Sequence, residues 1–455
     1  MNRNILKLLL FTALTYLAAC SSSDNTTKEL EETFPEKTPE DHKSNLEQAG
    51  LDYVDQMEIL TNSESVTAAT NLSNLLNMSD PFGDDTQEHP GSAFRILHDL
   101  KGFKEGKLSA KDLANRRTKE GEEPTSIQEL FDELKGTYTW NSEAEDWDYT
   151  EGGDIAVFKF PSEDGGTSND AEFAIRNYTG TIIDGNPLNE SEDYTGDLPT
   201  ALLSDLSIDG TKVMDYSFNA AYTNNGTPTS LTTALTLSPF RLSYNFSNTT
   251  AEISTSYAIK ENNNNILSSE VSVQGNFDVD NVESSIDSED ISGIVTGGSS
   301  SVQIFDIQLA GNVTDIDGLE EAVIDIDELQ EAGNYDDAAA LMGTTLNKHL
   351  DYKIKYASKN EVIALGSVEG VVMEETYYDY YWDEGTQNWE QYEVVDTWIE
   401  PELILEFGDG SKVSLETYGE EGFEDLTSSI EDLLAELGLD DEEDQVEEVP
   451  IRQVD

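Results

Sequence analysis

Apolar and polar residues alternate with a period of two through the middle of the chain, from 198 to about 277. In the first clear run, Met214, Tyr216 and Phe218 share one face, and polar residues take the positions between them. The same alternation recurs in four further runs, at 231–237, 240–246, 253–259 and 271–277. Turn sequences such as Asp209-Gly210 and Asn262 to Asn265 lie between the strands. Short strands joined by short turns predict an antiparallel β meander.

One face of the predicted meander is aliphatic and aromatic, and the other consists mainly of Ser, Thr and Asn. This pattern is typical of a sheet that meets water on one face only. Burying one large apolar side chain stabilises a protein by roughly 1.5–3 kcal/mol, so exposing a whole face of them is costly. We therefore expect helices or a lipid to cover the apolar face.

Apolar residues recur with a helical period on both sides of the meander. Three short stripes within 51–135 predict a cap of three or four helices, and two stripes around Gly333-Asn334 predict a helical hairpin at 316–351. A further stripe at 421–439 predicts one amphipathic helix. These patterns predict an α+β fold, in which an antiparallel meander forms a one-sided sheet, a sandwich or a half-barrel with flanking helices.

The patterns divide the chain into eight segments. They are a signal peptide at 1–19, a flexible acidic tether at 20–50, the helical segment at 51–135, the meander at 136–315, the helical hairpin at 316–351, an aromatic-rich β segment at 352–420, the amphipathic helix at 421–439 and an acidic tail at 440–455. The tether is rich in Ser, Thr, Glu, Lys and Pro, a composition typical of flexible chain.

Two pairs of tryptophans share one design. Trp140 and Trp147 are seven residues apart, as are Trp382 and Trp389, and polar turn residues lie between the members of each pair. Two hairpins of a duplicated sheet motif would explain this similarity. Coincidence among abundant aromatic residues would explain it equally well.

The first twenty residues have the pattern of an export signal that ends at a cysteine. Residues 1–7 carry Arg3 and Lys7 and no acidic residue, 8–17 are largely apolar, and small residues precede Cys20, the only cysteine. The segment resembles a bacterial lipoprotein signal peptide with its lipobox. The resemblance implies cleavage before Cys20, its acylation by chains such as palmitate, and a lipid anchor in place of a membrane-spanning helix. An ordinary secretory signal with an unrelated cysteine is the alternative.

The residue after Cys20 bears on the location of the protein. In the familiar enterobacterial sorting pattern, an aspartate at this position favours the inner membrane, whereas this chain has Ser21. The resemblance therefore implies the outer membrane, with the protein facing the periplasm or the cell surface. In its general acidic character, the chain is similar to surface lipoproteins of Bacteroidota and marine bacteria.

The charge of the mature chain restricts its partners. Without residues 1–19, 23 Lys and Arg remain against 94 Asp and Glu, which gives a net charge of −71. Such a field repels nucleic acid and bare anionic membrane surfaces. We therefore expect partners that are neutral, cationic or linked through a divalent cation, and no nucleic acid. With Cys20 used by the anchor, no thiol is left for a disulfide.

No sequence motif of a known reaction is present. The four histidines, His42, His89, His98 and His349, are not spaced as zinc ligands, and the sequence has no Gly-x-Ser-x-Gly elbow, phosphate loop or dinucleotide-binding turn. With 94 acidic residues, a pair of carboxylates has little diagnostic value. We therefore expect a protein without catalytic residues and without a cofactor.

Calcium is the metal that the acidity favours, but the sequence predicts only nonspecific binding. An EF-hand frame around Asp315 fails, because its first and twelfth positions would be Val313 and Ile324. An oxygen cage near Asp278, Asp280 and Asp287 is no more specific than the acidity of the whole chain.

Aromatic residues concentrate between 377 and 398. On a strand, Tyr378, Tyr380 and Trp382 share one face, and Trp389 lies close behind them in the chain. These four residues form a candidate platform for stacking on sugar rings. Packing in a core is the other interpretation, and at least one aromatic face must be buried or bound by a partner.

Three hypotheses about function follow. The first is a lipid-anchored outer-membrane or cell-surface lipoprotein with a non-enzymatic structural or binding role, whose partners are the membrane, through Cys20, and an envelope protein or a glycan. The second is a carrier that holds an apolar ligand or lipid on the one-sided sheet. The third is a surface protein that binds or processes glycans.

Overall fold

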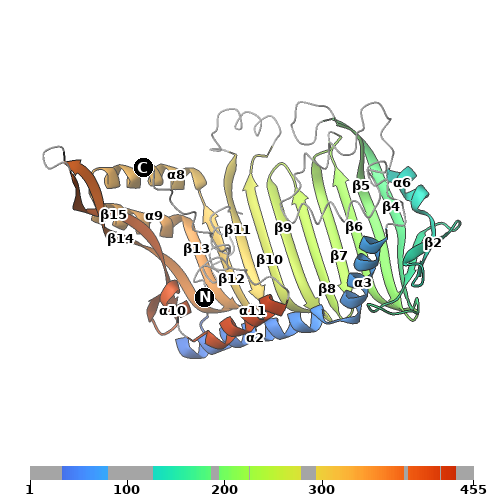
Figure 1. The fold of residues 1–455 in the computed structure, drawn as a ribbon. Coiled ribbons are helices and arrows are strands. Elements are labelled where there is room, and N and C mark those ends of the chain that lie inside the picture. Colours follow the sequence, from blue (N-terminus) through green and yellow to red (C-terminus); the bar gives the residue numbers. More distant parts are fainter. Residues whose placement is uncertain are drawn as a thin grey trace.

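All described strands belong to one open sheet. The structure is a computed structural model, and it describes residues 33–79, 127–185, 194–224, 226–277, 294–383, 388–420 and 422–436. Sixteen strands lie in the order β16-β15-β14-β13-β12-β11-β10-β9-β8-β7-β6-β5-β4-β3-β1-β2 (Figure 1). Neighbouring strands are antiparallel except for β1 and β3, which are parallel. The predicted sheet-rich α+β fold is confirmed, and the sheet does not close on itself.

The strands and helices have the following bounds. The strands are β1 (Gly136–Asn141), β2 (Asp146–Thr150), β3 (Ala156–Phe160), β4 (Ala171–Gly185), β5 (Tyr194–Ile208), β6 (Thr211–Tyr222), β7 (Pro228–Leu237), β8 (Phe240–Asn248), β9 (Glu252–Glu261), β10 (Asn264–Gly275), β11 (Val295–Ile304), β12 (Ile307–Thr314), β13 (Leu350–Tyr356), β14 (Glu361–Asp383), β15 (Asn388–Phe407) and β16 (Lys412–Ser414). The helices are α2 (Pro39–Thr61), α3 (Glu64–Met78), α6 (Ile127–Leu134), α8 (Ile316–Glu331), α9 (Tyr335–His349), α10 (Leu415–Glu420) and α11 (Glu424–Glu436).

Two of the turns between strands use left-handed backbone. Asp209 and Gly210, between β5 and β6, have φ values of 49° and 76°, and Asn262 and Asn263, between β9 and β10, have 46° and 74°. Two successive positive φ values are the signature of a type I′ turn, whose twist matches that of a β hairpin. Both turns lie where the sequence predicts them.

The strand register separates apolar from polar side chains. Leu235 of β7 pairs with Leu242 of β8, which pairs in turn with Ile259 of β9. On the other face, Asn245 of β8 pairs with Ser256 of β9. Cross-strand partners point to the same face of a sheet. The middle of the sheet therefore has an aliphatic and aromatic face and a Ser/Thr/Asn face, as the alternation predicts.

Helices α2 and α11 pack along one margin of the apolar face. Val54 of α2 and Leu433 of α11 join Leu237 of β7, Phe240 of β8 and Ile266 of β10 in one buried cluster. In Figure 1, α2 runs beneath the lower ends of the strands with α11 beside it. This margin of the sheet is therefore closed by helices from both ends of the chain.

The two ends of the sheet have cores of their own. At one end, Leu72 of α3 and Phe131 of α6 pack with Phe158 of β3 in a cluster that includes residues of β1, β2, β4 and β5. At the other end, Ala339 of α9 packs with Ile399 of β15. The sheet is thus held by separate clusters along its length.

The structure corrects the predicted start of the helical segment. We expect flexible tether as far as residue 50, but α2 begins at Pro39. The hydroxyl of Thr38 accepts from the backbone of Asp41, and the carboxylate of Asp41 accepts from the backbone of Thr38. This capping box and a proline in the first turn fix the helix start.

The structure also corrects the division of the β segments. Strands from 136–315 and from 352–420 belong to the same sheet, because β12 pairs with β13. The hairpin expected at 316–351 corresponds to α8 and α9, which pack on β14 and β15 rather than over the meander. The predicted signal peptide, most of the tether, the helices expected within 80–126 and the acidic tail lie outside the described residues.

Candidate functional site

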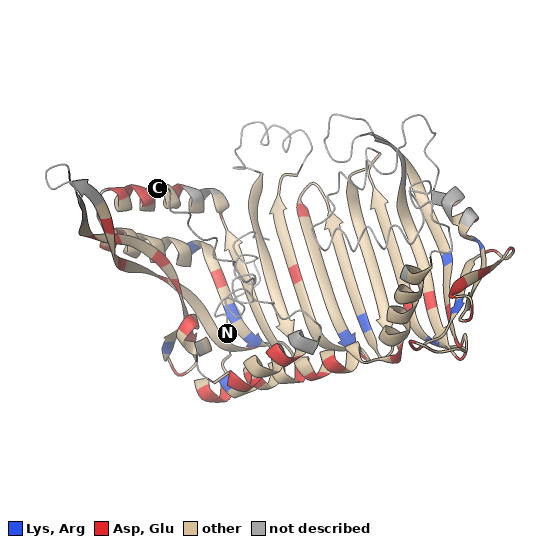
Figure 2. Ribbon diagram, in the orientation of Figure 1, with Lys and Arg blue, Asp and Glu red and all other residues tan. Residues whose placement is uncertain are grey.

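The charge of the chain is distributed unevenly over the sheet. Strands β7 to β12 contain five charged residues in total, Arg241, Glu252, Lys260, Glu261 and Glu270. Figure 2 shows acidic residues mainly on the helices and at the two ends of the sheet. The middle of the sheet is therefore nearly neutral, although the chain as a whole has a net charge of −69.

The described helices leave part of the apolar face of this neutral region exposed. Tyr244 of β8 and Tyr257 of β9 are cross-strand partners, and their exposed fractions are 38% and 43%. The adjacent pair Leu242 and Ile259 is partly buried against the cluster under α2. Helix α2 thus covers the margin of the face but does not seal the tyrosine pair. We call the surface around Tyr244 and Tyr257 on β7 to β10 the open apolar face.

Helix α2 also contributes to the rim of the open apolar face. Burial raises the pKa of Tyr53 on α2, and the proximity of Tyr257 adds to the rise. Tyr53 packs against the same buried cluster as Leu242 and Ile259. Tyr53 therefore adds an aromatic side chain to this rim, which suits an apolar ligand.

The opposite face of the same strands is polar. Asn245 donates to the hydroxyl of Ser256 over 3.3 Å, and the hydroxyls of Ser272 and Ser299 lie 3.3 Å apart. These short side chains pair with each other across the strands and can also bond to water. The two faces of the sheet therefore differ in polarity but share a low charge.

A second exposed surface lies on the long ribbon of β14 and β15. The two strands pair without a break from Ala364 with Phe407 to Asp383 with Asn388. The pairing of β14 with β13 ends at Leu365, and that of β15 with β16 involves only 404–406. The outer part of the ribbon therefore extends beyond the neighbouring strands. We call residues 373–380 and 389–398 the arm.

Aromatic side chains are exposed on both faces of the arm. The exposed fractions of Tyr378, Tyr380 and Trp389 on one face are 58%, 57% and 66%, and Tyr377 and Tyr392 on the other face are also exposed. The interpretation of this stretch as core is therefore wrong for these residues. Because β13 and β16 stop short, no other described strand lies beside the arm for its rings to pack against.

Trp382, the fourth residue of the predicted sugar platform, is placed by its backbone only. It pairs with Trp389 across β14 and β15, just beyond the arm. Its side chain lies outside the described residues. Tyr378 and Tyr380 share one face of the arm, as the sequence predicts, and the pairing of Trp389 with Trp382 brings Trp389 to the same face.

Carboxylates lie among the rings of the arm. The hydroxyl of Tyr392 donates to Asp379 over 3.0 Å, and this bond raises the pKa of Tyr392. The pKa of Tyr377 is also raised, chiefly by the charge of Asp396. Both shifts have the sign expected of a negative potential around the rings.

The two tryptophan hairpins share a register but not an environment. Trp140 pairs with Trp147 across β1 and β2, just as Trp382 pairs with Trp389. Both members of the first pair are buried, and the Nε1 of Trp147 donates to the carbonyl of Ser79 over 3.1 Å. The first hairpin therefore serves the core, whereas Trp389 in the second is exposed.

The described histidines hold structural contacts. His42 of α2 is buried, with its Nδ1 3.0 Å from the hydroxyl of Tyr356 on β13. His349 of α9 is buried with its Nδ1 2.9 Å from the carbonyl of Thr314, to which it donates. His89 and His98 lie outside the described residues. Both described histidines thus join a helix to the sheet.

An open cavity lies beside the His42 contact. It has a volume of about 540 Å³ and lies between the first turns of α2 and the sheet near β12 and β13. Its lining includes Lys37, Asp52, Lys359 and Glu361, so both signs of charge are present. No local sequence pattern indicates this cavity, because it forms only where α2 docks.

Within the residues that the structure describes, no cluster of three or more His, Cys, Asp or Glu could hold a metal ion. Asp315, which suggested a calcium loop, instead caps α8 by accepting from the backbone of Gly318 over 3.2 Å. Asp278, Asp280 and the predicted lipidation site Cys20 lie outside the described residues. Among the described helices, none has the length and apolar character needed to cross a bilayer.

Known proteins provide no functional parallel for this chain. No protein-family model matches it, and neither does a curated protein sequence or a solved structure. The open apolar face and the arm therefore carry the functional argument by themselves.

Proposed function

We propose that this chain is a non-enzymatic binding protein, anchored to the outer membrane through Cys20, that holds an apolar ligand on its open apolar face. The observation that carries the proposal is the exposure of Tyr244 and Tyr257 in the middle of that face. Exposed apolar patches on folded proteins commonly mark ligand or partner sites. The proposed ligand is a fatty acyl chain, as found in a lipid.

The chemistry of the face favours an acyl chain over a sugar. Leu235, Leu242 and Ile259 form a row beside the tyrosine pair, and side chains of this kind offer no hydrogen bond to a sugar hydroxyl. Each methylene removed from water contributes about 0.8 kcal/mol, so a chain lying along the row would be held without any charged contact. The predicted anchor would also keep the protein beside a source of lipid.

A non-enzymatic role is supported by the sequence and by the use of the described histidines. The sequence has no catalytic motif. His42 and His349 are committed to contacts that join helices to the sheet. Binding of an apolar ligand requires an apolar surface and no reactive group. The open apolar face is such a surface.

Fluorescence of the uncharged dye N-phenyl-1-naphthylamine tests the proposal on the soluble form that lacks residues 1–20. We expect the dye to bind, and the double variant Tyr244→Thr/Tyr257→Thr to weaken binding at least about tenfold, which corresponds to about 1.4 kcal/mol. Threonine suits a strand, so the fold should be retained.

The matched control is Asn245→Thr/Ser256→Thr, the neighbouring cross-strand pair on the opposite face of the same two strands. We expect this control to bind the dye like the wild type. Equal dye binding by all three proteins, or none by the wild type, would contradict the proposal.

A further inference from the structure

We propose that the arm is a docking site for a Lys- and Arg-rich polypeptide segment, separate from the open apolar face. The arm offers exposed aromatic rings, carboxylates among them and no positive charge of its own. A basic segment is the partner whose chemistry matches all three features.

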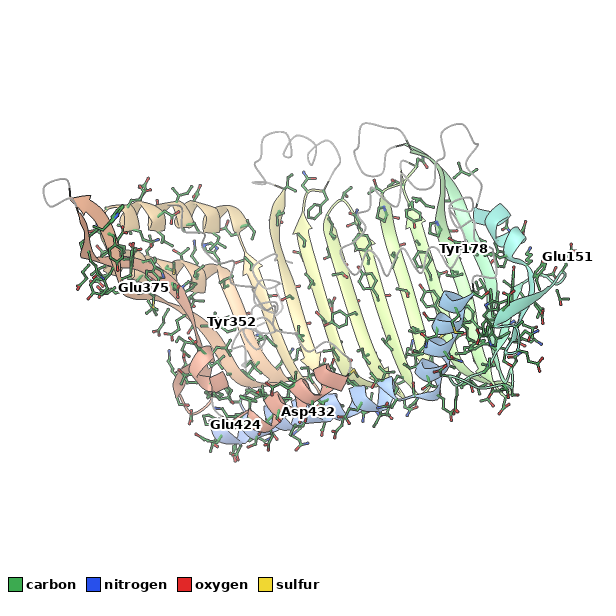
Figure 3. All side chains as sticks on the ribbon, viewed as in Figure 1. Glu151, Tyr178, Tyr352, Glu375, Glu424 and Asp432 are labelled. Atoms are coloured by element: carbon green, nitrogen blue, oxygen red, sulfur yellow. The ribbon has the colours of Figure 1, made fainter. Side chains whose placement is uncertain are left out.

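The geometry of the arm makes its rings accessible. Tyr378 and Tyr380 of β14 point to the same face of the ribbon. Glu393 of β15 is the cross-strand partner of Tyr378 and therefore points to that face as well. Figure 3 shows side chains projecting from both sides of this ribbon around Glu375. A partner can therefore reach ring and carboxylate together on one face.

The composition of the arm is one-sided in charge. Residues 373–380 and 389–398 contain six aromatic and six acidic residues and no Lys or Arg. Among the described side chains, Glu374, Glu375, Glu393 and Asp396 are exposed, and no described Lys or Arg forms a salt bridge with them. The negative charge of the arm is therefore not neutralised by the described part of the chain.

Cations bind both kinds of group that the arm presents. The faces of Tyr and Trp rings attract ammonium and guanidinium groups, and Arg also stacks on them. Carboxylates beside the rings accept charge-assisted hydrogen bonds from the same groups. The raised pKa values of Tyr377 and Tyr392 accord with a negative potential on this ribbon.

Two alternative roles for the arm, protection of a strand edge and binding of a neutral glycan, explain fewer of its features than binding of a basic segment does. Acidic residues protect exposed strand edges from aggregation, but that purpose does not require exposed rings. A neutral glycan would use the rings but would gain little from six carboxylates and the absence of basic residues. The charge complementarity therefore favours the basic segment over the glycan.

Fluorescence anisotropy with a labelled hexa-arginine peptide tests this inference on the soluble form lacking residues 1–20, at about 150 mM salt to suppress distant charge effects. We expect Tyr378→Thr/Tyr380→Thr to weaken peptide binding about fivefold or more. The matched control Tyr244→Thr/Tyr257→Thr removes two exposed tyrosines elsewhere and should change the affinity less than twofold. Circular dichroism verifies that both variants keep the sheet.

A second pair of variants separates the arm from the acidity of the whole chain. Glu374→Gln/Glu393→Gln removes two charges from the face of Tyr378, and Glu424→Gln/Asp432→Asn removes two exposed charges from α11. We expect the first variant to weaken binding several-fold more than the second. Equal losses would overturn the inference, as would displacement of the peptide by neutral maltohexaose, which would indicate a glycan site.

Discussion

The hydroxyl of Tyr356 on β13 lies 3.0 Å from Nδ1 of His42 on α2, and the two residues are 314 positions apart. Lys37 donates to the same hydroxyl oxygen over 3.3 Å, and Asn45 donates to it over 3.0 Å. These donors occupy both lone pairs, so the hydroxyl proton is left for Nδ1 of a neutral His42. The contact therefore fixes the ring with its proton on Nε2 and ties α2 to the sheet.

Replacement of Tyr356 by phenylalanine should destabilise the protein. The substitution removes the shared partner of three side chains and leaves the buried Nδ1 of His42 without its donor, which costs about 1–3 kcal/mol. Urea unfolding measures the loss. The control Tyr244→Phe alters an exposed tyrosine and should stay within about 0.5 kcal/mol of the wild type. If Tyr356→Phe and Tyr244→Phe are equally stable, the contact between Tyr356 and His42 does not stabilise the fold.

Acid should weaken the same contact. Burial lowers the pKa of His42, the nearby Lys37 lowers it further, and Asp41 opposes them. The folded state therefore binds the proton less well than the unfolded state. The contribution to stability is present above about pH 6.5, the ordinary value for histidine, and is lost as the pH falls through the lower folded value.

The pH effect is measured as a difference between two proteins, because many carboxylates also titrate in acid. We expect the stability advantage of the wild type over His42→Gln to shrink between about pH 7.5 and pH 5. Thermal unfolding at several pH values gives this difference. An advantage that grows toward the acid end would mean that the folded state prefers the charged ring.

Replacement of Gly370 by alanine should loosen the packing of α9 on β14. An added Cβ would lie 2.7 Å from Cα of Ala339, so the helix must move. Overpacking of this kind typically costs about 1–3 kcal/mol. The control Gly419→Ala meets nothing within 4 Å and should be neutral or slightly stabilising in α10. Urea unfolding distinguishes them, and a neutral Gly370→Ala would refute the close approach.

The sheet could be predicted because its signals are local. Alternation places Leu235, Leu242 and Ile259 on one face, and turn residues such as Asn262 set where the strands reverse. Each signal needs only a few neighbouring residues. The number of strands in one sheet depends on contacts between distant residues. No local pattern indicates that β12 pairs with β13, because a helical hairpin separates the two strands in the sequence.

Neither the start of α2 nor the exposure of the arm could be predicted, because both depend on contacts with distant parts of the chain. The capping residues Thr38 and Asp41 are visible in the sequence, but the first half of the helix, residues 39–50, has few apolar residues and depends on contacts such as His42 with Tyr356. Alternation correctly placed Tyr378 and Tyr380 on one face. Whether that face is buried depends on where the neighbouring strands stop, and composition does not encode this.

Replacement of Cys20 by serine tests the proposed anchor. The variant lacks the only cysteine sulfur that could accept lipid, so the chain should move to the soluble or the uncleaved fraction. Labelling of cells with an alkynyl fatty acid, followed by fractionation of the envelope, detects the change. The control Ser21→Ala should keep both the label and the membrane fraction. Label on Cys20→Ser, or none on the wild type, would exclude Cys20 as the site.

Native mass spectrometry tests the central claim most directly, through the ligand itself. The form lacking residues 1–20, exported behind a secretory signal and purified from the envelope without detergent, should carry an added mass that tandem fragmentation identifies as an acyl lipid. The variant Tyr244→Thr/Tyr257→Thr should lose that mass, and Asn245→Thr/Ser256→Thr should keep it. A bare polypeptide mass for the wild type, or the same adduct on all three proteins, would contradict binding on the open apolar face.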